Sequence, residues 1–194
     1  MKDYRKGIKI LSTSAIVLYL MFLVWGLFFK FGDIEYTRKC SYGLSLLTTK
    51  ERLLYDIIPF DFGNTEQKMI HFMLNILNML VFIPLAVVLI FRSGKIKPVK
   101  HALFCFIVSL IFEVSQFFTL IGGFASDDLL MNTMGYFAGA LLYYVLFRRL
   151  SDKINFYLLL IFNVILVPTF IYSFFNIIPI FDQYVGIVKD FAMK

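Results

Sequence analysis

Charged residues are scarce in this 194-residue chain, at 16% against the roughly 25% of ordinary soluble domains. Hydrophobic residues make up 60% of the chain, and 24 of its residues are Phe. This balance is too apolar for a soluble domain, so we predict an integral membrane protein. The net charge of +6 comes from Lys and Arg in short clusters between apolar runs, without the basic stripe interleaved with aromatics that binds nucleic acid. We therefore expect membrane lipids, and no nucleic acid, as partners.

Cysteine is almost absent, and so are the familiar catalytic motifs. The two Cys residues, Cys40 and Cys105, have no metal-ligand spacing. The sequence has no Gly-rich phosphate loop, no Ser nucleophile elbow and no Cys–His pair. We predict no cofactor and no metal site, although four oxygen and nitrogen ligands can be imagined to converge. These are His71, Glu113, Asp127 and Asp128.

Five apolar runs are long enough to cross a hydrocarbon core about 30 Å thick, for which about 20 helical residues suffice. They are residues 8–31, 70–91, 99–121, 129–147 and 154–179. No small-residue cleavage site follows the first run, so we predict an uncleaved span and not a signal peptide. Pro168 is expected to kink the last run. We predict an all-α fold, a polytopic membrane helix bundle of about five transmembrane helices, with residues 1–194 in a single membrane domain.

Basic residues predict the orientation of this bundle. The amino terminus, the turn at 92–100 and the turn at 148–153 carry four, four and three Lys or Arg, eleven in all, against seven on the other side. The positive-inside rule then predicts a cytoplasmic amino terminus and an extracytoplasmic carboxyl terminus. The long loop at 32–68, after the first helix, would lie outside the cell. Its apolar piece at 53–60 predicts a short amphipathic helix on the outer leaflet, and a merely solvated loop is the alternative.

Each of the three middle runs has one polar or small-residue face at helical spacing, and membrane helices turn such faces toward one another. The three faces are His71, Asn75 and Asn78; Ser109, Glu113 and Gln116; and Asn132, Gly135 and Gly139. We predict that they line a pocket in the outer half of the membrane. An ionised carboxylate within a membrane costs about 2.5 kcal/mol or more, so we expect Glu113 to act as a proton donor or polar anchor. The predicted ligand-binding residues are Glu113, Gln116, Asp127, Asp128, Asn132, Asn78, His71 and Asn75.

A structural role is the alternative for most of these residues. The Asn and Gln side chains can serve only as hydrogen bonds between helices. Gly135 and Gly139 fit close helix packing. Asp127 and Asp128 fit helix capping, and His71 fits an ordinary interfacial residue.

Three polar motifs follow one another along the chain: Asn78-x-x-x-Phe82-x-Pro84-Leu85, then Glu113-x-x-Gln116, then Asp127-Asp128-x-x-x-Asn132-x-x-Gly135-x-x-x-Gly139. With an earlier Ile58-Pro59-Phe60, they resemble the VanZ-like family of bacterial integral membrane proteins over about residues 52–147. The resemblance implies a multi-pass protein of the bacterial plasma membrane. It also implies antibiotic resistance, because the family's name-giving member confers low-level resistance to teicoplanin, a lipoglycopeptide that acts outside the cell.

The chain departs from the family's pattern next to the Asp pair. Family members commonly carry an Arg and a further Asp in the turn before the pair, where this chain has Gly122 and Ala125. The Asn that often precedes the Ile-Pro-Phe element is Asp56 here. Arg52, in the long loop, is a candidate for supplying the basic group that the turn lacks.

These observations favour one function and leave two others open. The leading prediction is that the pocket engages an amphiphilic envelope molecule, such as a lipoglycopeptide or a lipid-linked cell-wall precursor. The alternative is a membrane enzyme that modifies an envelope lipid, with Glu113 as general acid or base and the Asp pair holding a divalent ion. A transport or accessory subunit is the third, which the absence of an internal repeat disfavours.

Overall fold

The computed structural model describes residues 2–29, 44–45, 65–118 and 124–192. Its helices are α1 (Lys2–Phe29), α4 (Thr65–Ser93), α5 (Pro98–Phe118), α6 (Ser126–Leu142), the π-helical turn η1 (Tyr143–Phe147) and α7 (Asp152–Ala192). Within these described residues, five helical stretches are long and apolar enough to cross a membrane. The predicted all-α fold with five spans is therefore confirmed. The predicted amphipathic helix at 53–60 lies outside the described residues.

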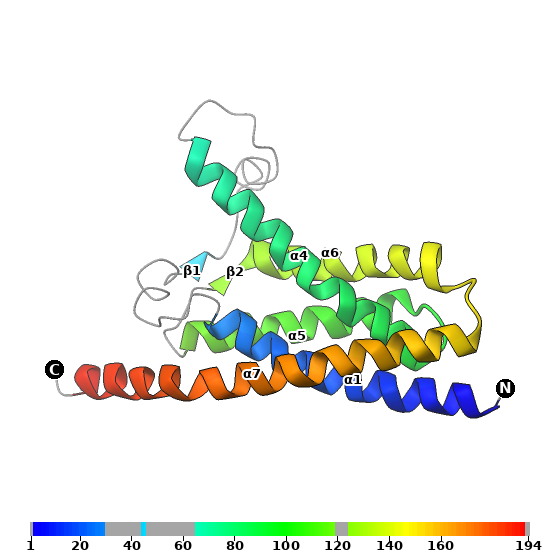
Figure 1. Ribbon diagram of the computed structural model, residues 1–194. Coiled ribbons are helices and arrows are strands. Elements are labelled where there is room, and N and C mark those ends of the chain that lie inside the picture. Colours follow the sequence, from blue (N-terminus) through cyan, green and yellow to red (C-terminus); the bar gives the residue numbers. More distant parts are fainter. Residues whose placement is uncertain (1, 30–43, 46–64, 119–123, 193–194) are drawn as a thin grey trace.

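Several helices extend beyond the apolar runs that predicted them. α1 begins at Lys2 instead of residue 8, and α4 begins at Thr65 instead of residue 70. Lys, Arg, Glu and Gln form helices well, so a helix continues where hydropathy falls. α7 contains the predicted last span and continues through Pro168 and Pro179 to Ala192 (Figure 1). A Pro removes one backbone hydrogen bond, and long apolar helices tolerate this loss.

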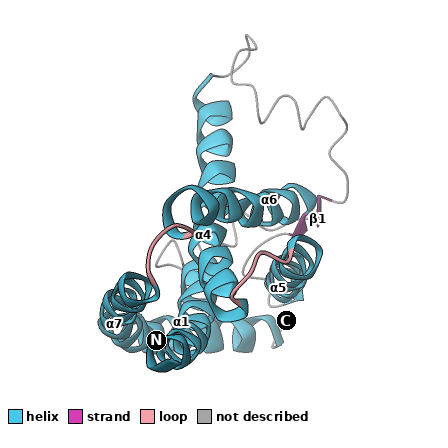
Figure 2. Ribbon diagram, turned by 90° about the vertical axis from the view of Figure 1, so that its right-hand side faces the viewer, coloured by secondary structure: helices cyan, strands magenta, loops and turns pink. Residues whose placement is uncertain are grey.

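Consecutive helices run in opposite directions along the bundle (Figure 1). The start of α1, the α4–α5 turn and the η1–α7 turn lie at one end, which we call the basic end because the predicted cytoplasmic Lys and Arg clusters are there. α6 begins at the other end with Asp127 and Asp128, and we call this the acidic end. Viewed along the bundle, α4 lies centrally, with α5 and α6 on one side and α1 and α7 on the other (Figure 2). α4 is thus the helix that joins the two halves.

The core of the bundle is apolar, and so are many of the side chains on its outside. Tyr19 and Leu23 of α1 pack in one buried cluster with Phe82 and Leu85 of α4 and Tyr136 of α6. The large apolar side chains exposed on the outer faces include Ile10, Leu103, Ile111, Phe137 and Ile161. A water-soluble protein rarely exposes so extensive an apolar surface, and a lipid bilayer covers it.

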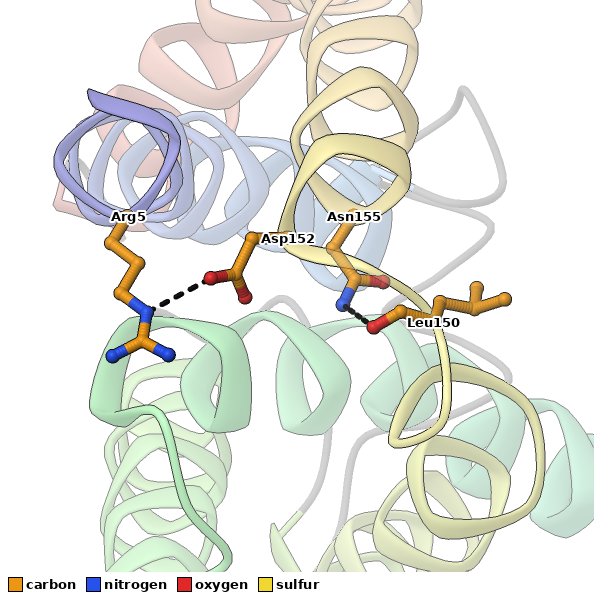
Figure 3. Close-up of polar contacts among 4 residues, drawn as sticks. All are labelled: Arg5, Leu150, Asp152 and Asn155. Carbon is orange, nitrogen blue, oxygen red and sulfur yellow. Dashed lines mark hydrogen bonds and ion pairs between the residues drawn. The ribbon is translucent and has the colours of Figure 1, made fainter. Parts of the chain in front are cut away.

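Polar contacts hold the helices together at the basic end. Arg5 Nε donates to Asp152 Oδ2 at 2.9 Å, which joins α1 to α7 (Figure 3). Next to this pair, Asn155 Nδ2 donates to the Leu150 carbonyl at 3.4 Å (Figure 3). Deeper in the α1–α7 contact, Asn163 Nδ2 donates to the Leu11 carbonyl at 3.1 Å. The last two Asn residues were not predicted to be buried, although their spacing of eight puts both on one face of a helix.

A short strand pair lies beside the start of α6. β1 (Leu44–Ser45) pairs in parallel with β2 (Phe124–Ala125), with Leu44 opposite Phe124. The pair satisfies backbone groups of both segments. Leu44 and Ser45 belong to the segment that connects α1 to α4 in the sequence, and the pairing holds them against the residues that lead into α6.

Candidate functional site

Two glycines bring α6 directly against the backbone of α4. A Cβ atom on Gly135 would collide with the Met79 carbonyl oxygen and lie 2.8 Å from Phe82 Cβ. A Cβ atom on Gly139 would lie 2.7 Å from the Ile83 carbonyl oxygen. Small residues allow membrane helices to approach closely, and at these two positions even a Cβ atom would meet the α4 backbone. The interpretation of these glycines as packing residues is confirmed.

The close approach puts the polar face of α4 against the start of α6. Asn78 Nδ2 donates to Asp128 Oδ1 at 2.7 Å, and both side chains are half-buried. Asp127 and Asp128 lie in the first turn of α6, where carboxylates favour the helix dipole. Asp128 therefore lies where a carboxylate stabilises the start of a helix. It also contacts Asn78, another predicted site residue.

The polar face of α5 turns inward toward α6. Glu113 is 3% exposed and Gln116 is 9% exposed, so both side chains are buried. One turn further toward the basic end, the fully buried Ser109 accepts a hydrogen bond of 2.8 Å from Asn132 Nδ2. The three polar faces predicted from spacing thus meet along the contacts of α6 with α4 and α5. We call these residues the polar cluster; its members are Asn78, Ser109, Glu113, Gln116, Asp127, Asp128 and Asn132.

The remaining predictions for the site have different outcomes. Asn75 is half-buried in α4, one turn before Asn78 on the same side of the helix. His71 also lies in α4, but its side chain lies outside the described residues. Among the side chains that the structure does describe, no three His, Cys, Asp or Glu are grouped closely enough to hold a metal ion. The pocket itself stays a prediction.

The polar face of α5 continues toward the basic end, beyond the residues predicted from the sequence. His101 and Cys105 precede Ser109 at intervals of four residues, and both are buried. The ring of Tyr136, from α6, lies 6.0 Å from the His101 ring. In the described part of the chain, His101 Nδ1, Asn132 Oδ1 and the Tyr136 hydroxyl are buried without a protein hydrogen-bond partner. Buried groups of this kind commonly bind ordered water, so we expect this part of the α5–α6 contact to be hydrated.

Together, the fold and the polar cluster define a multi-pass membrane helix bundle in which most of the predicted polar site residues meet toward the acidic end. The family model described as VanZ/LLP1 matches residues 16–148 of this chain. The chain is also 30% identical over 145 residues to Protein VanZ of Enterococcus faecium, an alignment that covers 75% of this chain and 81% of that protein. This protein belongs to the VanZ/LLP1 family, and the resemblance predicted from its motifs is confirmed. No solved structure matches it.

Proposed function

We propose that this protein protects a bacterial cell against lipoglycopeptide antibiotics such as teicoplanin, through a site at the acidic end that engages an amphiphilic molecule of the outer leaflet. The observation that carries the proposal is the convergence of predicted site residues from three helices. Asn78 contacts Asp128 across 50 positions of sequence, and the buried Glu113 and Gln116 lie on the face of α5 that is turned toward α6. Membership in the VanZ/LLP1 family supports the link to resistance.

The chemistry of the acidic end suits a ligand with a polar and an apolar part. Carboxylate and carboxamide groups of the polar cluster offer hydrogen bonds to peptide or sugar groups. Exposed apolar side chains lie near the same end, with Leu77 on α4, Phe118 on α5 and Leu130 on α6. An acyl chain can lie against such faces while its head group reaches the polar residues.

In this proposal the residues of the site have distinct roles. Glu113 anchors the polar part of the ligand or donates a proton to it. Asp127 and Asp128 contact the head group. The amide and imidazole side chains orient the ligand; these are Asn75, Asn78, Asn132, Gln116 and His71.

The proposal requires the acidic end to face out of the cell. The three basic segments lie together at the opposite end, which the positive-inside rule places in the cytoplasm (Figure 1). A reporter enzyme that is active only outside the cytoplasm, fused after Lys194, checks this orientation. We expect an active fusion, since five spans put the two termini on opposite sides, and activity only of a cytoplasmic reporter would contradict the orientation.

Antibiotic susceptibility tests the function. We would measure teicoplanin and vancomycin inhibition of a sensitive bacterial host that expresses the wild type or Glu113→Gln at matched membrane levels. The substitution keeps the shape of the side chain and removes its titrating proton. We expect the wild type to protect against teicoplanin and Glu113→Gln to lose that protection.

A matched control and a lipid analysis sharpen this experiment. Asp152→Asn makes the same carboxylate-to-amide change at the basic end, and we expect it to keep full protection. Equal loss in both variants would contradict a specific role for Glu113, and no protection by the wild type would contradict the proposed function. A new envelope lipid species in wild-type membranes, detected by mass spectrometry, would contradict a binding function and support the alternative of a lipid-modifying enzyme.

A further inference from the structure

A second candidate site lies at the basic end, far from the polar cluster along the bundle. A cavity of about 460 Å³ opens there between α1 and α4. Its lining combines three cations with two hydroxyl groups and one apolar side chain. These residues are Lys6, Lys9, Ile10, Thr13, Ser14 and Arg92.

One of the three cations of this cavity is positioned by a contact between the two helices. Arg92 Nε, on α4, donates to Thr13 Oγ1, on α1, at 2.7 Å. A guanidinium has five N–H donors, so this bond positions the group and leaves further donors for an anion. Arg5 differs, because Asp152 neutralises it at 2.9 Å (Figure 3).

The cavity therefore concentrates positive charge. Within the described part of the chain, no carboxylate lines the cavity, and the nearby Asp152 is paired with Arg5. Two ammonium groups, a guanidinium and the Ser14 hydroxyl are donors of the kind that bind a phosphate, whereas Thr13 Oγ1 already donates to the Lys9 carbonyl at 2.8 Å. Charge complementarity thus points to an anionic phosphate group as the occupant.

An apolar strip leads from this cavity along α1 toward the middle of the bundle. Ile10, which lines the cavity, is 61% exposed. Val17, Met21 and Val24 follow at intervals that keep them on the same face of the helix, and all three are exposed. A free anion would make no favourable contact with this apolar face, whereas the acyl chain of a lipid packs against it.

We propose that the cavity between α1 and α4 binds an anionic glycerophospholipid of the leaflet at the basic end. Its phosphate contacts Lys6, Lys9 and Arg92, and its acyl chain follows the exposed face of α1. Basic pockets between membrane helices on the cytoplasmic side are known sites for anionic lipids. The site is independent of the proposed function, because it shares no residue with the polar cluster.

Native mass spectrometry of the full chain in a neutral detergent tests the proposal. The protein is titrated with dioleoyl phosphatidylglycerol or with dioleoyl phosphatidylcholine, and lipid adducts are counted. We expect preferential retention of phosphatidylglycerol by the wild type. Lys9→Gln and Arg92→Gln should each weaken this binding about fivefold, which corresponds to the effect of one cation near an anionic lipid surface.

Two arms of the experiment can overturn the proposal. Lys100→Gln and Lys153→Gln remove the same charge at the same end of the bundle without touching the cavity, and we expect them to change binding less than twofold. An equal loss in these controls means that net charge alone attracts the lipid, and the site is wrong. Millimolar inorganic phosphate should leave the phosphatidylglycerol adducts in place, and complete displacement would identify a free-anion site instead.

Discussion

Replacing Gly135 by Ala would place a methyl group in the closest contact between α4 and α6. The new Cβ atom would collide with the Met79 carbonyl oxygen and lie 2.8 Å from Phe82 Cβ. A backbone carbonyl cannot rotate away as the end of a flexible side chain can. The two helices must therefore separate, and that movement also loosens the neighbouring Asn78–Asp128 contact.

The expected cost follows from two opposing effects. Overpacking a tight contact costs about 1–3 kcal/mol. Ala is a better helix former than Gly by roughly 1 kcal/mol, which offsets part of that cost. The upper part of the overpacking range, about 2–3 kcal/mol, applies because the collision is with a backbone carbonyl, so we expect Gly135→Ala to lower the free energy of unfolding by about 1–2 kcal/mol. Gly139→Ala should act similarly, because its Cβ atom would lie 2.6 Å from Ala86 Cβ.

The two substitutions are not independent. One displacement of α6 away from α4 relieves both collisions, since the glycines lie one turn apart on the same face. The double variant should therefore lose less stability than the sum of the two single losses. Additive losses would mean that the two positions respond separately.

Unfolding by SDS in mixed micelles measures these changes, with the fluorescence of Trp25, the single Trp of the chain, as the signal. Met134→Leu serves as the control, because it changes a lipid-exposed side chain of the same helix without adding bulk to the contact. We expect the control to unfold like the wild type. A Gly135→Ala variant at least as stable as the wild type would refute the close approach of the two helices.

Two further predictions use the same unfolding assay. In a double-mutant cycle of Asn78→Ala and Asp128→Ala, we expect a coupling energy of about 0.6–1.7 kcal/mol, the range of hydrogen bonds between membrane helices. A coupling near zero would contradict the 2.7 Å bond between these side chains. Tyr19→Phe removes the hydroxyl that donates to the Val81 carbonyl at 2.7 Å, and we expect it to lower the free energy of unfolding by about 1 kcal/mol. Tyr157→Phe, on an exposed face, is the control and should unfold like the wild type. Equal stability of these two Phe variants would show that the bond between α1 and α4 contributes nothing.

The sequence determined the number of spans, the family and the inward polar faces. Apolar runs of sufficient length define membrane helices whatever their neighbours are, because an isolated helix satisfies its own backbone hydrogen bonds in lipid. The spacing of Ser109, Glu113 and Gln116 likewise fixes one face of α5 locally. The spacing of Gly135 and Gly139 predicted a close helix contact for the same reason, although it named no partner helix.

Local sequence patterns did not predict the residues at which the helices begin and end. Hydropathy marked where apolar residues stop, and α1 and α4 begin earlier because polar residues also form helix. For α7, hydropathy marked a span that ends near residue 179, whereas the helix continues to Ala192. The missed face of His101 and Cys105 was visible in the spacing, but its burial depended on Tyr136 from another helix.

Only the tertiary structure decided which side chains meet. Asn78 pairs with Asp128, and Asn132 pairs with Ser109, at separations of 50 and 23 residues. Lys6, Lys9 and Arg92 share a cavity only because α1 lies beside α4 at the basic end. Helical periodicity fixes the face on which a residue lies, but not the rotation and depth at which one helix packs against another. Those depend on the fit of whole surfaces, and here the absence of side chains at Gly135 and Gly139 sets how closely α4 and α6 approach.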